Sequence, residues 1–157
     1  MVAEDGRELY AVNADMDQYL VLTHPFVGEH VWPHLPLTDP EPRTLDGGHR
    51  RLDLDHPDVR PRTQIARLVS TFLAQFPDVE LWAWYSSYDH VVLAQLFGTM
   101  VQLPDHIPKF TCDMRQEAYL QGDPPLPEQT SGEHNALEDA RHNLARARAL
   151  GIIGGRP

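Results

Sequence analysis

The longest regular pattern of apolar residues lies between Thr63 and Phe76. Six apolar side chains recur there at helical spacing: Ile65, Leu68, Val69, Phe72, Leu73 and Phe76. Residues three and four apart lie on one face of an α-helix, so the pattern predicts an amphipathic helix that packs against a core. We expect Thr63 to cap this helix and Pro77 to end it.

The other patterns are shorter. Asp5-Gly6 between two strand-like runs is a strong signal for a β-hairpin, which we predict over residues 1–12. Further elements are predicted in chain order: a short helix or strand within 13–35, a buried strand at 79–85, a helix at 89–97 that ends before Gly98, a short strand at 110–114 and a helix at 136–150. Strands that alternate with helices in this way predict an α/β fold.

Two stretches have the composition of irregular structure. Residues 36–62 are rich in Pro, Asp, Arg and Gly, and we predict a long loop there. A loop of that length in a compact domain often has a functional role. Residues 99–130 carry five prolines and are predicted to be irregular outside the short strand. We therefore predict one domain over residues 1–150, followed by a tail at 151–157.

The bulk composition excludes few functions. The chain has 157 residues, 41% of them hydrophobic, which suffices for one core. No apolar run approaches the roughly 20 residues of a membrane helix, the first residues do not resemble a signal peptide, and the single cysteine permits no intrachain disulfide. We therefore expect a cytoplasmic protein without a membrane partner. The net charge of −10 argues against a broad basic surface for long duplexes, but bound divalent cations can bring positive charge to a carboxylate cluster.

The most informative polar pattern is Gly-Glu-His-Asn-Ala-Leu-Glu-Asp-Ala at residues 132–140. Asn135 is expected to cap the last helix, with Glu138 completing a capping box. If His134 lies outside the helix and Asp139 in its first turn, both side chains can point at one site. Asp139 can then ligate Mg²⁺, and His134 can take a proton from an attacking water. On spacing alone, a surface helix with a capping asparagine and two solvated charges is the more common arrangement.

Asp89 is a second candidate, because it lies between a predicted strand and the next helix. Aspartate is a favoured N-cap, and that role alone would explain it. However, open α/β sheets bind ligands at the carboxyl ends of their strands. Asp89 therefore also fits a place in a functional site.

Together these segments resemble the DEDD family of 3′–5′ exonucleases. The His134 segment is similar to the family's last motif, in the subclass whose histidine lies five residues before the final aspartate, and Trp84-Tyr-Ser-Ser-Tyr-Asp89 is similar to the segment of the middle aspartate. Within the family the resemblance is closest to RNase AS, the polyadenylate-specific 3′-exoribonuclease related to RNase T. It runs from residue 2 to about 150, is weakest at 36–62, and also includes Val2–Val12, Glu80–Trp84 and Tyr88–Val91.

The resemblance implies an RNase H-like fold, in which helices flank a mixed central sheet, and a 3′–5′ exoribonuclease that releases nucleoside 5′-monophosphates from single-stranded RNA. It implies that Asp89 and Asp139 bind two Mg²⁺ ions, which Mn²⁺ can replace, and that His134 is the general base. It also implies adenine-rich RNA 3′ ends as substrate and a homodimer.

Aromatic residues are candidates for stacking on the terminal base of the RNA, as in other proteins that bind single strands. Trp84 and Phe110 are the candidates for substrate binding, together with Trp32. Large aromatic side chains are more often part of a core, so both roles stay open.

The chain departs from the family at its first strand. Family members carry an Asp-x-Glu there, and both carboxylates bind metal, whereas Val2–Val12 is similar to the second and third strands. Glu4 and Asp5 fall in the turn between those strands, away from the expected metals. The predicted fold therefore lacks its first strand, and the predicted site lacks two carboxylates.

Two explanations compete for this departure. We favour a natural start upstream of Met1, because removal of a central strand leaves backbone groups unpaired. The alternative is a catalytically inactive homologue that binds a nucleotide or a partner. Either way, we expect no Mg²⁺-dependent trimming of oligo(A) by the 157-residue chain. A third hypothesis is a different metal hydrolase that joins another histidine to His134 and Asp139, although we expect no zinc-type spacing to support it.

Overall fold

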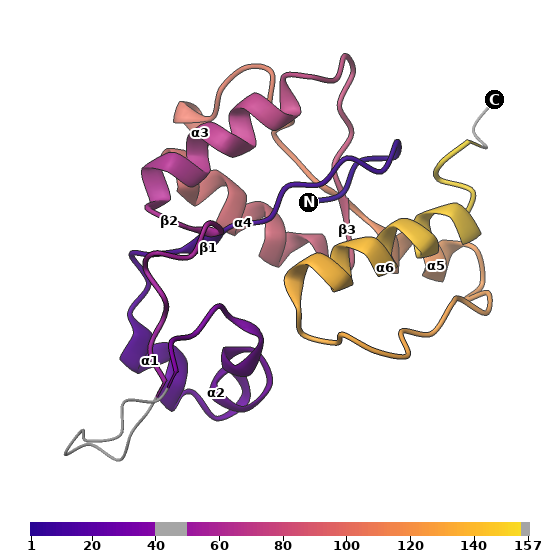
Figure 1. Cartoon of the computed structure of the whole chain (residues 1–157). Coiled ribbons are helices and arrows are strands. Elements are labelled where there is room, and N and C mark those ends of the chain that lie inside the picture. Colours follow the sequence, from indigo (N-terminus) through magenta and orange to yellow (C-terminus); the bar gives the residue numbers. More distant parts are fainter. Residues whose placement is uncertain (40–49, 155–157) are drawn as a thin grey trace. The chain divides into compact units, whose positions relative to one another are not determined.

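The computed structural model describes residues 1–39 and 50–154. The chain divides into two compact units, one made of Met1–Leu9 and Ala66–Pro157 (unit 1) and the other of Tyr10–Ile65 (unit 2). Helices and small parallel strand pairs make the structure mixed α/β, as predicted (Figure 1). The RNase H-like arrangement and the single domain stay predictions.

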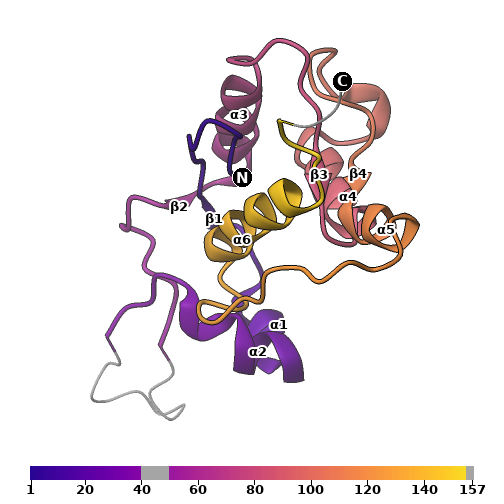
Figure 2. The same cartoon turned by 90° about the vertical axis from the view of Figure 1, so that its right-hand side faces the viewer.

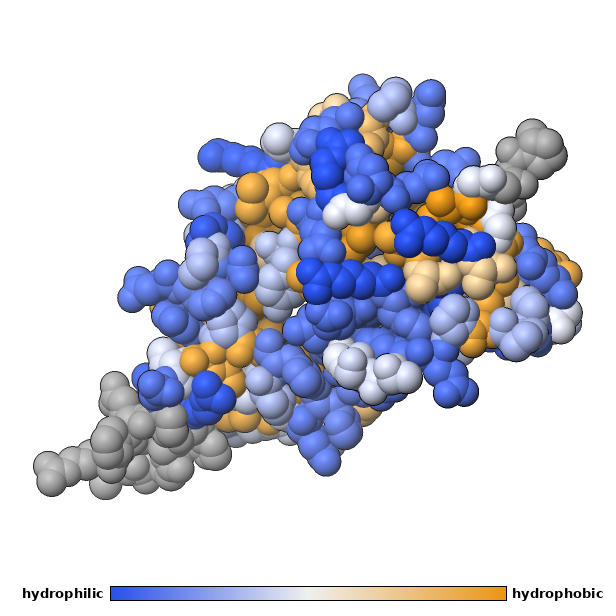
Figure 3. All heavy atoms as spheres, turned by 45° about the vertical axis from the view of Figure 1, so that its right-hand side comes forward, coloured by the Kyte–Doolittle hydropathy of each residue, from blue (hydrophilic) through white to orange (hydrophobic). Residues whose placement is uncertain are grey.

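None of the described helices is long and apolar enough to span a lipid bilayer. On the face drawn in Figure 3, hydrophilic residues predominate, with hydrophobic ones exposed between them.

Unit 2 is built on a parallel pair of two-residue strands, β1 (Val12–Asn13) and β2 (Val59–Arg60). Val12, Leu52 and Val59 are each at most 5% exposed and form a core cluster. The prediction of one loop over 36–62 is therefore wrong at Leu52 and β2. A two-residue strand is too short to show the alternation of apolar and polar residues by which strands are predicted. Residues 40–49 of that predicted loop lie outside the described residues.

Residues 13–35 contain helices rather than a second strand beyond β1. They are α1 (Gln18–Thr23), α2 (Pro25–His30) and the 3₁₀-helix η1 (Trp32–His34). Asp17 caps α1, since its carboxylate accepts a hydrogen bond from the Leu20 N–H at 3.0 Å. Trp32 is only 6% exposed, which favours the core role over base stacking for this residue.

Contrary to expectation, the sequence contains one pair of histidines with zinc-type spacing. His30 and His34 are four residues apart, as in His-x-x-x-His. The two residues belong to different helices, α2 and η1. Among the described residues, no three His, Cys, Asp or Glu side chains are grouped closely enough to hold a metal ion. A zinc site therefore finds no support in this part of the structure.

Unit 1 begins with the predicted hairpin. Val2 and Glu8 form an antiparallel bridge, and the turn between them includes Glu4, Asp5 and Gly6. Gly6 adopts a φ of 87°, which a residue without Cβ tolerates well.

Helix α3 (Arg62–Leu73) confirms the most periodic segment of the sequence. Val69, Phe72 and Leu73 are buried, whereas Leu68 is 40% exposed, so the apolar stripe is narrower than predicted. The helix begins at Arg62, and Thr63 is therefore inside it and not its N-cap.

Two strands of unit 1 pair in parallel, β3 (Trp82–Ala83) with β4 (Cys112–Asp113). Both lie within predicted strands, but each is shorter than predicted. After β3 the described part of this unit contains four helical segments. Two lie before β4, α4 (Ser86–Phe97) and the 3₁₀-helix η2 (Met100–Gln102), and two lie after it, α5 (Met114–Leu120) and α6 (Ala136–Ala149). The predicted irregular structure at 99–130 is therefore wrong at η2 and α5.

The core of this part of unit 1 lies between α5 and α6. Met114 and Ala118 of α5 pack with Ala147 and Leu150 at the end of α6, and all four are at most 5% exposed. The side chains of Trp82 and Trp84 pack against this cluster. Figure 2 shows α4, β3, β4 and α5 in one group, and β3 contacts α4, β4 and α5.

Candidate functional site

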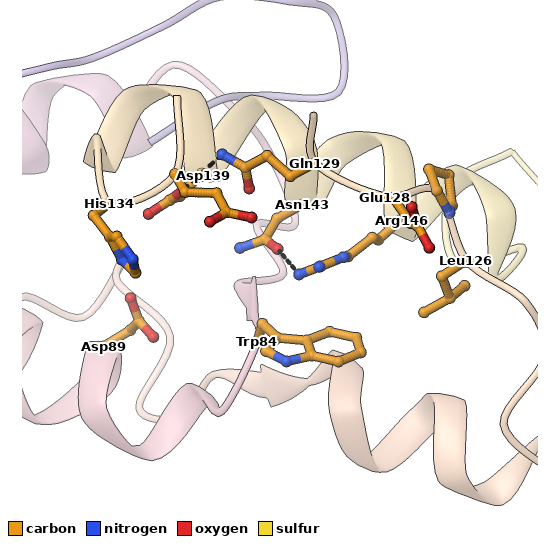
Figure 4. Close-up of a pocket in the computed structure, with 11 residues that line it drawn as sticks. Trp84, Asp89, Leu126, Glu128, Gln129, His134, Asp139, Asn143 and Arg146 are labelled. Atoms are coloured by element: carbon orange, nitrogen blue, oxygen red, sulfur yellow. Dashed lines mark hydrogen bonds between the residues drawn. The ribbon is translucent and has the colours of Figure 1, made fainter. Parts of the chain in front are cut away.

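A pocket of about 800 Å³ lies at the carboxyl end of β3, within unit 1 (Figure 4). Its volume is in the range of small-ligand sites. The lining residues come from the end of β3, the first turn of α4, the segment before α6, and α6 itself: Trp84, Asp89, Leu126, Pro127, Glu128, Gln129, Glu133, His134, Asp139, Asn143 and Arg146. Four predicted site residues, Trp84, Asp89, His134 and Asp139, therefore line the same pocket.

The start of α6 positions His134 and Asp139. The side chain of Asn135 caps the helix by accepting hydrogen bonds from the N–H groups of Leu137 and Glu138, at 3.0 and 3.2 Å. His134 lies outside the helix, as predicted, with a φ of 66° that is uncommon for a residue with Cβ. Backbone conformations of this kind are often found at functional sites.

The predicted capping box is wrong in its second half. The N–H of Asn135 donates to the carbonyl of Gly132, not to the carboxylate of Glu138. Glu138 instead forms an ion pair with Arg141, one turn later on the helix. Asn135 alone therefore provides the side-chain cap of α6.

Asp139 lies in the first turn of α6 and has a neighbour that the sequence did not indicate. The Nε2 of Gln129 donates a hydrogen bond of 2.8 Å to its Oδ1. Because this bond comes from the segment before the helix, it restrains the Asp139 carboxylate from across the pocket. Amide groups of this kind orient carboxylates at metal sites.

Asp89 lies within α4 and does not cap it. The helix begins at Ser86, and Tyr85 is at the N-cap position with a left-handed φ of 60° and no side-chain cap bond. Asp89 is consequently in the first turn, and its carboxylate and the His134 imidazole point toward one another in Figure 4. Partial burial raises the pKa of Asp89, and the negative charge of Asp113 raises it further.

Asp113, at the end of β4, holds the starts of two helices. Its Oδ2 accepts hydrogen bonds from the N–H of Ser86 at 2.9 Å and from the Ser86 hydroxyl at 3.3 Å. Its Oδ1 accepts from the N–H groups of Arg115 and Gln116, at 2.8 and 3.1 Å. Burial works to raise the pKa of Asp113, but the hydrogen bonds from Gln116, Ser86 and Arg115 outweigh it and the pKa is lowered.

The other end of the pocket is cationic. The guanidinium of Arg146 lies over the ring of Trp84, 4.4 Å from its centroid, and its Nη1 donates a long bond of 3.4 Å to Asn143 Oδ1. Sequence reasoning missed both residues. The signal was present, because residues 139, 143 and 146 are spaced to lie on one face of a helix.

Phe110 is not brought to this pocket. It is 68% exposed and precedes β4, so it lies at the opposite end of the strand from Asp113. It does not line this pocket, and its role in binding substrate stays a prediction.

The sequence does contain two Asp-x-Glu triplets, Asp39-Pro-Glu and Asp78-Val-Glu. The first belongs to unit 2 and runs into residues that the structure does not describe. Asp78 and Glu80 are exposed at the amino end of β3, and neither lines the pocket. Asp78-Val-Glu therefore does not take the place of the first-strand motif.

The two pocket aspartates suit a hard cation such as Mg²⁺, which proteins usually bind through one or two carboxylates together with water and substrate phosphates. Asp89 and Asp139 could hold one such ion. In the part of the chain that is described, no three metal-ligating side chains lie close enough together to hold an ion by themselves.

Comparison with known proteins identifies the family. A family model described as the 3′–5′ exoribonuclease Rv2179c-like domain matches residues 50–150. Two relatives from Mycobacterium tuberculosis, the 3′–5′ exoribonuclease Rv2179c of strain H37Rv and the 3′–5′ exoribonuclease MT2234.1 of strain CDC 1551, are each 37% identical over 150 residues. Each match covers 96% of this chain and 80% of the relative. The chain therefore belongs to the family of Rv2179c-like 3′–5′ exoribonuclease domains.

Proposed function

We propose that this domain hydrolyses single-stranded RNA from the 3′ end and releases nucleoside 5′-monophosphates. The observation that carries the proposal is that Asp89, His134 and Asp139 line one pocket in a member of an exoribonuclease family. The resemblance of the His134 and Asp89 segments to the DEDD exonucleases supports the same assignment. RNase AS, within that family, makes adenine-rich RNA the first substrate to test.

In this proposal each residue has a separate role. His134, at the start of α6, accepts the proton of the attacking water. Asp89 and Asp139 hold Mg²⁺ through carboxylate oxygens from two different helices. When bound, the ion neutralises charge that develops on the phosphate oxygens. A two-ion centre needs carboxylates beyond these two, and the first-strand Asp-x-Glu of the DEDD exonucleases would supply them.

A second candidate is a domain that binds RNA 3′ ends without cleaving them. It is favoured by the absence of a group of three metal-ligating side chains from the described residues. Both candidates predict that RNA binds in the pocket. They differ only in whether the bound strand is shortened.

The two candidates are distinguished with oligo(A) labelled at its 5′ end. The 157-residue chain is incubated with the RNA and Mg²⁺, and strand length and binding are followed for the chain, for His134→Ala and for Asp139→Asn. His106→Ala is the control, because His106 is exposed, bonds to Ser70 and does not line the pocket. Because the proposed hydrolysis needs carboxylates beyond Asp89 and Asp139, we expect these 157 residues to bind the strand without shortening it, and hydrolysis to appear only where an Asp-x-Glu supplies the remaining metal ligands.

Stepwise shortening that His134→Ala abolishes, and His106→Ala does not, would show that the pocket residues suffice for catalysis. That result would overturn our account of the missing carboxylates. If no RNA is bound at all, both candidate functions fail.

A further inference from the structure

The guanidinium of Arg146 has hydrogen-bonding capacity that the protein does not use. Its Nε is buried without a partner among the described residues, and the bond from its Nη1 to Asn143 Oδ1 is long at 3.4 Å. No carboxylate forms an ion pair with it in the described part of the chain. Guanidinium carries five N–H donors, and buried donors without acceptors cost stability. Because Arg146 lines the pocket, its terminal Nη groups can reach a ligand there.

The charge distribution indicates which kind of ligand fits. Arg146 is the one Arg or Lys among the described residues that line the pocket, and four of the lining residues are Asp or Glu. Guanidinium matches a phosphate with two parallel N–H···O bonds, and it keeps its charge at any physiological pH. A phosphate group is therefore the natural partner at this end.

Three residues on one face of α6 relate this end to the catalytic end. Asp139, Asn143 and Arg146 all line the pocket, and seven residues of helix separate the first from the last by about 10 Å along the axis. Asp139 is proposed to act at the scissile phosphate. The 3′-terminal nucleotide ends in a hydroxyl, so every other phosphate of the strand lies on the 5′ side.

We infer that Arg146, held on the ring of Trp84, binds the phosphodiester on the 5′ side of the scissile one. The inference rests on the proposed function, because it places the scissile phosphate near Asp139. Trp84 then has a different role from the base stacking first considered for it. One face of its ring is covered by the guanidinium at 4.4 Å, so Trp84 positions Arg146.

The test measures the affinity of a five-nucleotide oligoadenylate, with Ca²⁺ in place of Mg²⁺ so that the strand stays intact. Arg146→Gln removes the charged guanidinium with its paired N–H donors, whereas Arg146→Lys keeps the positive charge without those paired donors. Arg148→Gln is the matched control, since Arg148 is exposed on the same helix and donates to the Glu4 carbonyl. Thermal melts of each variant show whether it folds.

We expect Arg146→Gln to weaken binding at least about tenfold, the effect of one lost charge-assisted hydrogen bond. The affinity of Arg146→Lys should lie between that of Arg146→Gln and that of the unaltered chain, and Arg148→Gln should bind as tightly as the unaltered chain. The slope of log Kd against log salt should fall by about 0.7 for Arg146→Gln, which is the contribution of one single-strand phosphate.

A strand with one uncharged methylphosphonate linkage identifies the phosphate. Neutralising the linkage 5′ of the scissile one should weaken binding to the unaltered chain about as much as Arg146→Gln does, and should add nothing to that variant. The inference would be overturned if the losses of affinity from the neutral linkage and from Arg146→Gln simply add. It would also be overturned if Arg146→Gln is non-additive with neutralisation of the scissile linkage instead, or if Arg146→Gln and Arg148→Gln weaken binding equally. If the unaltered chain binds no RNA, the proposed function itself fails.

Discussion

Asp113→Ala should destabilise unit 1 more than substitution of either aspartate that lines the pocket, because the Asp113 carboxylate holds the starts of two helices. Its two oxygens accept four hydrogen bonds, two from Ser86 at the start of α4 and two from the start of α5. Loss of a side-chain cap costs about 1 kcal/mol. Two helix starts therefore give a loss of about 2 kcal/mol.

The loss is measurable as a fall in melting temperature. For a chain of this size, 1 kcal/mol corresponds to about 2–4 °C, so we expect a fall of about 4–8 °C at pH 7. Circular dichroism of the helices during heating is the assay. Asp105→Ala is the control, since Asp105 lies exposed in the turn between Pro104 and Ile107, and its melting temperature should stay close to that of the unaltered chain.

The pH dependence of the same difference tests its electrostatic origin. The pKa of Asp113 is lowered in the folded state, so its stabilising effect is present above the ordinary value of 3.8. It is lost as the pH falls through the lowered value, because a protonated carboxyl accepts these hydrogen bonds less well. The gap in melting temperature should therefore narrow as the pH falls below 3.8. A gap at pH 7 no larger than that of Asp105→Ala, or one that stays constant with pH, would refute this explanation.

Two further substitutions test other charged groups of unit 1. Asp89→Asn should raise stability to urea at pH 7. Because the pKa of Asp89 is raised in the folded state, the protonated carboxyl favours folding below the ordinary value of 3.8, and this contribution is lost as the pH rises through the raised value. At pH 7 the partly buried carboxylate is charged, and the neutral asparagine avoids that cost. The gain should vanish in acid, and a gain that persists there would contradict the pKa argument. Arg141→Gln should leave the melting temperature near that of the unaltered chain, although Arg141 pairs with Glu8 at 2.6 Å, because exposed ion pairs contribute little in water. A fall as large as that of Asp113→Ala would contradict this expectation.

The sequence was most informative where structure is determined locally. The start of α6 follows from Asn135, whose partners are two and three residues away, and α3 follows from its apolar periodicity. The start of α4 does not follow in this way. Its first N–H is held by Asp113, 27 residues later in the chain, so no local signal distinguishes Ser86 from Asp89 as the first residue.

The candidate site shows the same division. A short motif sufficed to predict that His134 and Asp139 lie together, because both are at one helix start. Arg146 was missed because its role depends on Trp84, which reaches the pocket from the end of β3. A charged residue on a helix is normally solvated, and only the tertiary contact shows that this one is stacked and partly buried. Non-local pairing likewise explains why β2 was taken for part of a loop.

The charge of the chain limits how RNA can be held. At −10 overall, the protein does not attract a polyanion over long distances, so affinity has to arise within the pocket. Cations bound at Asp89 and Asp139 would counter the carboxylates at one end, and Arg146 supplies positive charge at the other. Few phosphates are neutralised in such a site, so affinity gains little from strand length. A pocket that binds a strand through two neighbouring phosphates and a terminal nucleotide is suited to an RNA end, which agrees with the exoribonuclease family to which the chain belongs.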